Sequence, residues 1–183
     1  MCFIEAQGSS RYTLELVSYV KLNGIAVWNF TWPAEIENWR GVTLFIVDLA
    51  DCTLQEVKNF DTWLNVENAE RLRDYLQGLV NGTVLVGVTY AEPMRAMLPP
   101  HPNAALSELS KLGADVSDLN TDGAFAFAAR IGDPARTVFK KGQYDMPRMP
   151  RIFATFNATF SGAQYTIYHR SSSAERSSLH CVP

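Results

Sequence analysis

The stretch GVTLFIVDL at residues 41–49 is apolar at almost every position, and the stretch TVLVGVTY at residues 83–90 is nearly as apolar. Such runs are typical of strands that are covered by protein on both faces. Between the two runs, residues 66–80 predict a helix, and Asn65 can cap its first turn. One stripe of this helix would carry the apolar side chains of Ala69, Leu72, Leu76, Leu79 and Val80.

Further strands and a second helix are expected on both sides of this central region. The dipeptide Asn23-Gly24 favours a tight hairpin turn, because such a turn needs positive φ at both positions. A short helix is predicted at residues 104–112, and residues 132–150 are basic and rich in proline, which is typical of a loop. The segments that predict further strands are residues 11–22, 25–32, 54–60, 124–131, 152–160 and 164–170.

The order of these elements is strands first, then strands alternating with two helices, then strands again. This order predicts an α+β fold, with β-sandwich-like mixed sheets and two short flanking helices. The 183 residues suit a single domain over residues 1–183. Within it we expect an N-terminal hairpin at about residues 11–32 and a C-terminal hairpin at about residues 151–170.

Composition excludes several classes of protein. Lysine and arginine total 16 against 19 aspartates and glutamates, so the net charge is -3, which argues against nucleic-acid binding. No apolar run approaches the roughly 20 residues that span a bilayer, so no membrane insertion is expected. Residues 1–7 lack the basic and apolar regions of a signal peptide.

Other features favour a secreted protein. Three N-glycosylation sequons begin at Asn29, Asn81 and Asn157, where roughly one or two would arise by chance. Of the three cysteines, Cys2 and Cys181 lie at the two ends of the chain, and domain termini often lie close together. We therefore expect a Cys2–Cys181 disulfide, with Cys52 either free or bonded to another chain. Three reduced cysteines are the alternative.

No catalytic or metal-binding motif is present. The three histidines lack metal-ligand spacing, and no nucleophile elbow, phosphate-binding loop or dinucleotide fingerprint occurs. The carboxylates of Asp115, Asp118 and Asp122 lack the spacing of a calcium loop. A Glu92–Asp122 pair for glycoside hydrolysis is conceivable, but the sequence says nothing of their separation. We expect no cofactor, no metal and no enzymatic activity.

Several motifs, in order, resemble the ILEI/PANDER family. The run WRGVTLFIV at residues 39–47 and the run VKNFDTW at residues 57–63 resemble its "RGxNV" strand and "FD-aromatic" motif. Residues 81–90 are similar to "(D/N)GTIVLxGTYD", residues 109–114 to "ADLGS", and residues 125–132 to "WxFxGxKG". The ending CVP at residues 181–183 resembles a family "CIP" ending.

The resemblance implies a compact pair of sheets with helices outside, in a secreted, cytokine-like protein. A related module in the stem of protein O-mannose N-acetylglucosaminyltransferase binds sugar. The residues that correspond to its ligand contacts lie at three motif ends, where the apolar faces of aromatic side chains would also lie. This implied ligand-binding set is Trp39, Arg40, Tyr90, Glu92, Asn120, Asp122 and Phe125.

The chain also departs from the family pattern. Ala128 stands where the family has the cysteine associated with covalent dimers, and Ala91 replaces a carboxylate. Asp122 replaces an arginine, which disfavours acidic sugars. The leading hypothesis is therefore a lectin that binds a neutral sugar, such as N-acetylglucosamine or a hexose, on glycans or glycoproteins. The alternative is a secreted signalling or protein-interaction module without sugar affinity.

Self-association is also expected. A single shallow sugar site binds weakly, and lectins gain strength through multivalency. The expected closing hairpin is rich in aromatic side chains that could form a homodimer interface, and the alternative is that they cover the core of the same chain. These aromatic residues are Phe153, Phe156, Phe160, Tyr165 and Tyr168.

Overall fold

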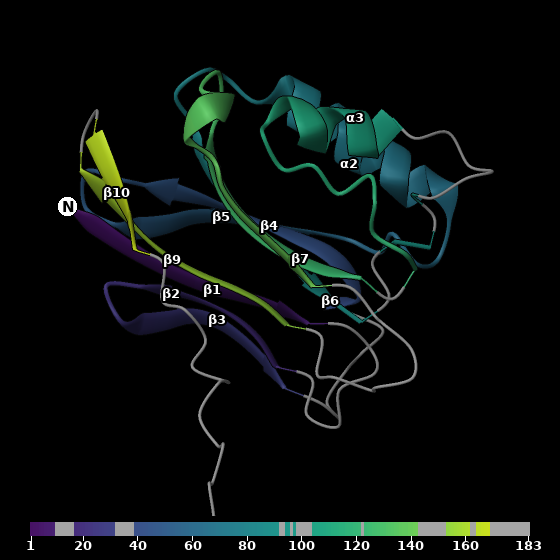
Figure 1. The fold of residues 1–183 in the computed structure, drawn as a ribbon, viewed down its shortest axis with the longest axis horizontal. Helices are drawn as coiled ribbons and strands as arrows, with labels where there is room; N and C mark the ends of the chain where they lie inside the picture. The colour runs from purple at the N-terminus through teal and green to yellow at the C-terminus, as the bar shows by residue number, and fades with distance from the viewer. Residues whose placement is uncertain are drawn as a thin grey trace, which may run out of the picture.

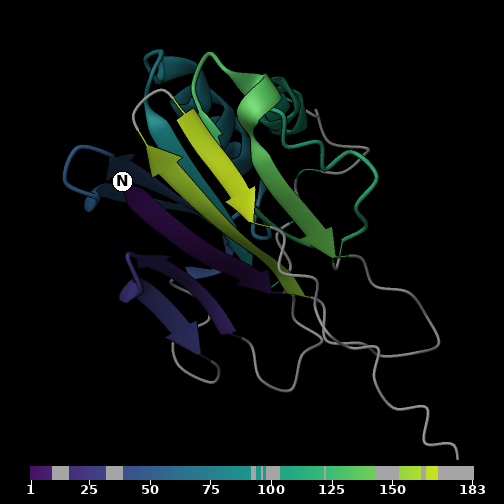
Figure 2. The ribbon, with the colours of Figure 1, turned by 60° about the vertical axis from the view of Figure 1, so that its left-hand side comes forward.

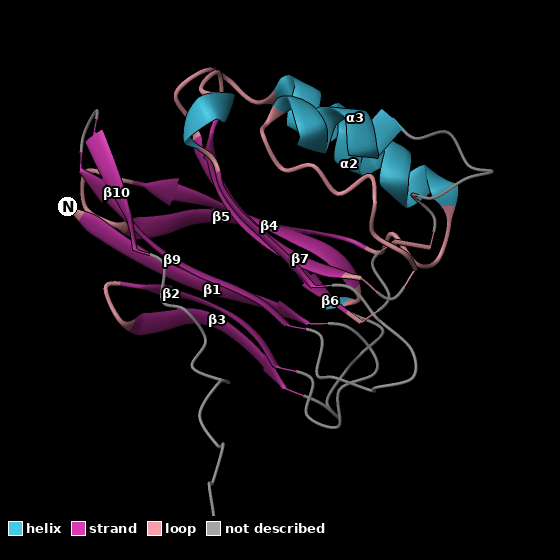
Figure 3. Ribbon diagram, viewed as in Figure 1, coloured by secondary structure: helices cyan, strands magenta, loops and turns pink. Residues whose placement is uncertain are grey.

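In a computed structural model of the chain, the described residues form two five-stranded sheets and two α-helices. Figures 1 and 3 show their arrangement. None of the described helices is long and apolar enough to cross a membrane. The structure describes residues 1–9, 17–31, 39–91, 94–95, 97, 104–121, 123–142, 153–161 and 164–168.

The first sheet has the strand order β10-β9-β1-β2-β3, and each neighbouring pair is antiparallel. Asn23 and Gly24 join β2 to β3 with φ values of 50° and 81°, as the hairpin prediction requires. The five strands are β1 (Cys2–Ser9), β2 (Val17–Leu22), β3 (Ile25–Thr31), β9 (Phe153–Ser161) and β10 (Gln164–Tyr168).

The second sheet has the strand order β5-β4-β6-β7-β8 and is also antiparallel throughout. Helix α2 (Val66–Gly78) carries the chain across β4 from β5 to β6, and helix α3 (Ala104–Lys111) precedes β7. A 3-10 turn (Pro134–Arg136) precedes β8. The five strands are β4 (Gly41–Asp48), β5 (Thr53–Phe60), β6 (Val84–Tyr90), β7 (Ala124–Arg130) and β8 (Val138–Gly142).

The second sheet is covered on both faces, which explains the unbroken apolar runs in β4 and β6. On one face, Phe45 and Val86 share a core with side chains of the first sheet, such as Ile4. On the other face, Leu44 and Leu85 share a core with the two helices. The three layers are therefore sheet, sheet and helices (Figures 1 and 2). This arrangement is consistent with the predicted sandwich-like α+β fold.

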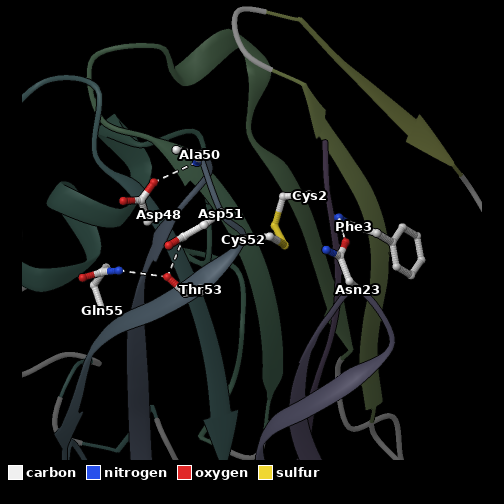
Figure 4. Close-up of a disulfide and its surroundings, with 9 residues drawn as sticks. All are labelled: Cys2, Phe3, Asn23, Asp48, Ala50, Asp51, Cys52, Thr53 and Gln55. Atoms are coloured by element: carbon white, nitrogen blue, oxygen red, sulfur yellow. Dashed lines mark hydrogen bonds between the residues drawn. A yellow bond between two sulfur atoms is a disulfide. The ribbon is translucent and has the colours of Figure 1, made fainter.

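A disulfide joins Cys2 of β1 to Cys52 in the turn between β4 and β5, with Cα atoms 5.1 Å apart (Figure 4). The prediction that Cys2 bonds Cys181 is therefore wrong. The physical reason is that residues 2–9 form a central strand of the first sheet, which carries Cys2 to the β4–β5 turn of the second. Cys181 lies outside the described residues.

Three other expectations need correction. The described sheets are antiparallel rather than mixed. Strand β1 was not among the predicted elements, although its buried and half-buried side chains alternate. Strand β8 lies inside the stretch 132–150 that was predicted as a loop, because it adds to the free edge of β7. The predicted helices, the N-terminal turn and the closing hairpin are confirmed within one to a few residues.

Candidate functional site

The start of β4, the end of β6 and the start of β7 lie at one end of the second sheet. Gly41 pairs with Tyr90, so the first residue of β4 stands opposite the last residue of β6. The Oγ1 atom of Thr89 accepts a hydrogen bond of 3.0 Å from the backbone N–H of Phe125 in β7. These three strand ends are therefore neighbours in space.

Arg40 is held at this end of the sheet by Asp61. Its Nε atom donates to Oδ1 of Asp61 at 3.0 Å, and its Nη2 atom donates to Oδ2 at 2.7 Å. Each of the two side chains is only 16% exposed. The guanidinium carbon also lies 3.8 Å from the centre of the Trp63 ring. Two-point pairing and stacking together fix the orientation of the Arg40 guanidinium group.

Gly41 makes this arrangement possible. Its φ of +100° lies in the region that favours glycine, and a Cβ atom there would meet the carbonyl oxygen of Phe60 and stand 2.6 Å from the backbone nitrogen of Thr62. The start of β4 therefore comes very close to the end of β5. That contact brings Arg40, directly before Gly41, beside Asp61, directly after Phe60.

Aromatic side chains from both sheets border the site. Trp28 of β3 contacts Trp39 edge to face, with ring centres 5.8 Å apart. Both rings pack against Tyr90 and Ala91, which are buried. The burial raises the pKa of Tyr90 to about 12. Asn59 donates a hydrogen bond of 3.1 Å to the carbonyl of Trp39, which helps to fix its backbone.

Buried hydroxyl groups connect the two sheets at the same end. The Oγ atom of Ser18 donates to the carbonyl of Thr89 at 2.8 Å and lies 2.8 Å from the Oγ atom of Ser9. These links run from β1 and β2 to β6. They tie the end of the first sheet, which carries Trp28, to the end of the second sheet, next to Arg40. The candidate site is therefore built on elements that are fixed relative to each other.

The structure treats the predicted site residues differently. Trp39, Arg40 and Tyr90 lie together, but the rings of Tyr90 and Phe125 are both fully buried, that of Phe125 against Phe127, so protein covers both rings. Asn120 is half-buried, and its carbonyl accepts the N–H of Gly123 at 3.0 Å. Glu92 and Asp122 lie outside the described residues.

Three residues of this cluster were missed by the sequence analysis, namely Asp61, Trp63 and Arg95. The guanidinium carbon of Arg95, an exposed residue, lies 4.6 Å from the centre of the Trp63 ring. Asp61 and Trp63 belong to the motif at residues 57–63, which was recognised as a family feature but given no part in the site. Nothing in the sequence links Arg95 to Trp63. We call the five residues Trp39, Arg40, Asp61, Trp63 and Arg95 the arginine–tryptophan cluster.

The acidic loop before β7 is engaged by neighbouring side chains. Asp115 accepts hydrogen bonds from the backbone N–H and the hydroxyl of Ser117 at 3.0 and 2.7 Å, which lowers its pKa. Asp118 pairs with Lys141 of β8. Among the described residues, no three histidine, cysteine or acidic side chains come together to hold a metal ion.

The protein is therefore a β-rich one, with two antiparallel sheets and helices on one outer face. A polar and aromatic cluster lies at the end of the second sheet. The Interleukin-like EMT inducer (ILEI) family model matches residues 40–133, which is more than half of the chain and spans β4 to β7. The chain belongs to this family. A comparison with curated proteins found no match.

Proposed function

We propose that this protein is a carbohydrate-binding protein and that its site is the arginine–tryptophan cluster. The observation that carries the proposal is the fixed Arg40 guanidinium group, held by Asp61 and stacked on Trp63. A donor that is already oriented loses little conformational freedom when a ligand binds. The ligand we propose is a neutral sugar such as N-acetylglucosamine or another hexose.

The chemistry of the cluster suits a neutral ligand. Asp61 balances the charge of Arg40, while the guanidinium group has further N–H donors beyond those directed at Asp61. These donors can bind hydroxyl or acetamido oxygens, and the carboxylate can accept from sugar hydroxyls. The half-buried Trp39 offers an apolar face for sugar C–H groups. Charge-assisted hydrogen bonds of this kind contribute about 1.5 to 3 kcal/mol each.

The proposal extends to the localisation, partners and oligomeric state of the protein. The family resemblance supports a secreted protein that binds its ligand without transforming it, with glycans or glycoproteins as partners. A homodimer would strengthen weak sugar binding through avidity. Of the aromatic residues in the closing hairpin, Phe160 is 1% exposed and belongs to the core between the sheets, so it is not part of a dimer surface. The other four side chains lie outside what the structure describes.

A signalling or protein-interaction role without sugar affinity is the second candidate. The observation that favours it is the family match, because the family is named for an interleukin-like inducer. In that case the arginine–tryptophan cluster would contact a protein, since arginine and tryptophan are enriched in the energetically important parts of protein interfaces.

A glycan array with the purified protein distinguishes the two candidates. We expect neutral saccharides to bind on the array. The affinity of each can then be measured by titration through tryptophan emission, because Trp28, Trp39 and Trp63 all lie near the site. Arg95→Ala should weaken binding severalfold without changing the melting temperature, because Arg95 is exposed. The matched control is Arg71→Ala on the exposed face of α2, which should bind as wild type. A blank array would decide for the interaction protein.

A further inference from the structure

The three N-glycosylation sequons lie in different surroundings in the folded chain. Asn81 lies in an exposed turn, Asn29 lies exposed on a strand at the edge of a sheet, and Asn157 is half-buried within a central strand. We propose that Asn29 and Asn81 carry N-linked glycans in the secreted protein and that Asn157 does not. The proposal does not depend on whether the protein binds sugar.

Asn81 is the best placed of the three. It lies in the turn between α2 and β6, and the N–H of Gly82 donates to the carbonyl of Ile131 at 2.9 Å, which anchors the turn to the end of β7. The Oδ1 atom of Asn81 lies against Gly132, where an added Cβ would stand 2.8 Å from it. The amide nitrogen, which carries a glycan, is the other branch of this amide group. It can therefore bear a sugar while the oxygen keeps its place against the protein.

Asn29 has space for a different reason. Strand β3 is an edge strand of the first sheet, with β2 as its neighbour, and Asn29 stands opposite Tyr19 of β2. An exposed edge can pair with another chain, and Ile25 on the same strand is 72% exposed. A hydrophilic glycan on Asn29 would cover this edge. The modification would thus oppose unwanted pairing of β3 with other chains.

Asn157 is enclosed by comparison. It lies in β9, between Glu5 of β1 on one side and Tyr168 of β10 on the other. Its Oδ1 atom is buried. Its side chain leaves from a face of the sheet with a paired strand on each side, so a glycan on Nδ2 would have to fit among the side chains of those strands. A chain modified there would lose packing on the first sheet and would fold less well.

The attachment reaction balances with a lipid-pyrophosphate-linked oligosaccharide as donor. The amide Nδ2 of the asparagine forms a bond to C1 of the first sugar, and the bond between C1 and the pyrophosphate oxygen breaks. Nδ2 gives up one proton, and the lipid pyrophosphate leaves. The threonines two residues later, Thr31 and Thr83, complete the two sequons that we propose to be used.

The two glycans would differ in their distance from the candidate site. Asn81 precedes β6, whose seven residues run to Tyr90 at the other end, and seven strand residues span roughly 23 Å. A glycan on Asn81 therefore leaves the arginine–tryptophan cluster open. Asn29 directly follows Trp28, which packs on Trp39, so its attachment point is nearer the cluster, although its side chain leaves from the opposite face of β3.

The test is to express the chain behind a secretion signal in cultured eukaryotic cells and to map the secreted protein. Release with a peptide N-glycosidase in heavy-oxygen water hydrolyses the glycosyl amide and converts each glycosylated asparagine to a labelled aspartate, which peptide mass spectrometry locates. We expect label at positions 29 and 81 and none at position 157. Label at Asn157, or the absence of label at Asn29 or Asn81, would overturn the proposal.

Matched variants give an independent readout on gels. Thr31→Ala and Thr83→Ala should each remove one glycan and one step of mobility, whereas Thr159→Ala should remove none. The same digests should contain the Cys2–Cys52 peptide, which shows that each secreted variant is folded. A mobility change in Thr159→Ala, or none in the other two variants, contradicts the assignment.

Discussion

Arg40 and Asp61 form a two-point ion pair that joins the start of β4 to the end of β5, with nitrogen–oxygen distances of 3.0 and 2.7 Å. Asp61 also accepts a hydrogen bond of 3.1 Å from the N–H of Leu64, so its carboxylate organises the turn before α2 as well. Arg40, which the family resemblance suggests as a ligand contact, is therefore also part of the scaffold. Binding and stability are coupled at this position.

Asp61→Ala should lower both stability and sugar affinity. The pair is largely buried, so its loss should cost about 1 to 3 kcal/mol, between the values for exposed and for fully buried pairs. Chemical denaturation measures the loss. The control is Glu67→Ala, which breaks the exposed Glu67–Arg71 pair on α2 and should cost less than about 0.5 kcal/mol. Equal effects of the two substitutions would argue against a structural role for the Arg40 pair.

Cys2→Ser should destabilise the protein strongly. The Cys2–Cys52 bond closes a loop with a sequence separation of 50 and ties the first sheet to the second, so its loss should cost about 4 kcal/mol in the loop-entropy model. Thermal unfolding with and without reductant should show the same loss in the wild type. Cys181→Ser is the control and should retain the wild-type melting temperature. If Cys181→Ser were as damaging as Cys2→Ser, the assigned pairing would be incorrect.

Gly87→Ala should destabilise the second sheet. Gly87 in β6 stands opposite Phe127 in β7, and an added Cβ would overlap the phenylalanine ring. Phe127 is fully buried between the sheet and the helices, so the ring has little room to move. We expect a loss of about 1 to 3 kcal/mol, as for other overpacked cores. Gly78→Ala on α2, where a Cβ meets nothing within 4 Å, is the control and should be neutral or slightly stabilising.

Stability should fall as the pH rises above 10. Burial raises the pKa of Tyr90 from 10.0 to about 12, and burial together with the Glu56 carboxylate raises that of Tyr75 to about 12. A tyrosine in the unfolded chain ionises near pH 10, so the stability from keeping these protons is complete below pH 10 and is lost as the pH approaches 12. Denaturation midpoints across this range measure the slope. Tyr75→Phe and Tyr90→Phe should each flatten it, and an unchanged slope in both variants would refute the explanation.

Local signals explain which elements could be predicted. The helical stripe and the cap at Asn65, whose side chain accepts from the N–H of Asn68, are encoded within a few residues, and α2 forms where they predict it. The apolar runs of β4 and β6 likewise indicate strands covered on both faces, and the structure covers them on both faces. The Asn23-Gly24 turn needs only the backbone freedom of its two residues. Each signal is complete within one short segment of sequence.

The candidate site was predicted only in part, because its residues come from separate segments. The family motifs identified Arg40, Trp39 and Tyr90, which lie together at the end of the second sheet. They also suggested Phe125, whose ring the fold buries, as it buries that of Tyr90. The stacking of Arg40 and Arg95 on Trp63 depends on a turn after β5 and a segment after β6 meeting in space. The spacing of residues in the sequence does not predict that these two segments come into contact.

The sequence by itself determined the helices, the strands with strong apolar runs, the hairpin turn and the family, because these follow from local backbone preferences and contiguous motifs. Only the tertiary structure decided the partners of Cys2 and Arg40. Strand β1 pairs with β9, whose residues lie about 150 positions away, and in the resulting fold Cys2 lies beside Cys52 of the β4–β5 turn. A cysteine or an arginine bonds to whichever group the fold brings within a few ångströms. That choice is made by long-range strand pairing and core packing, which are not encoded at either residue alone.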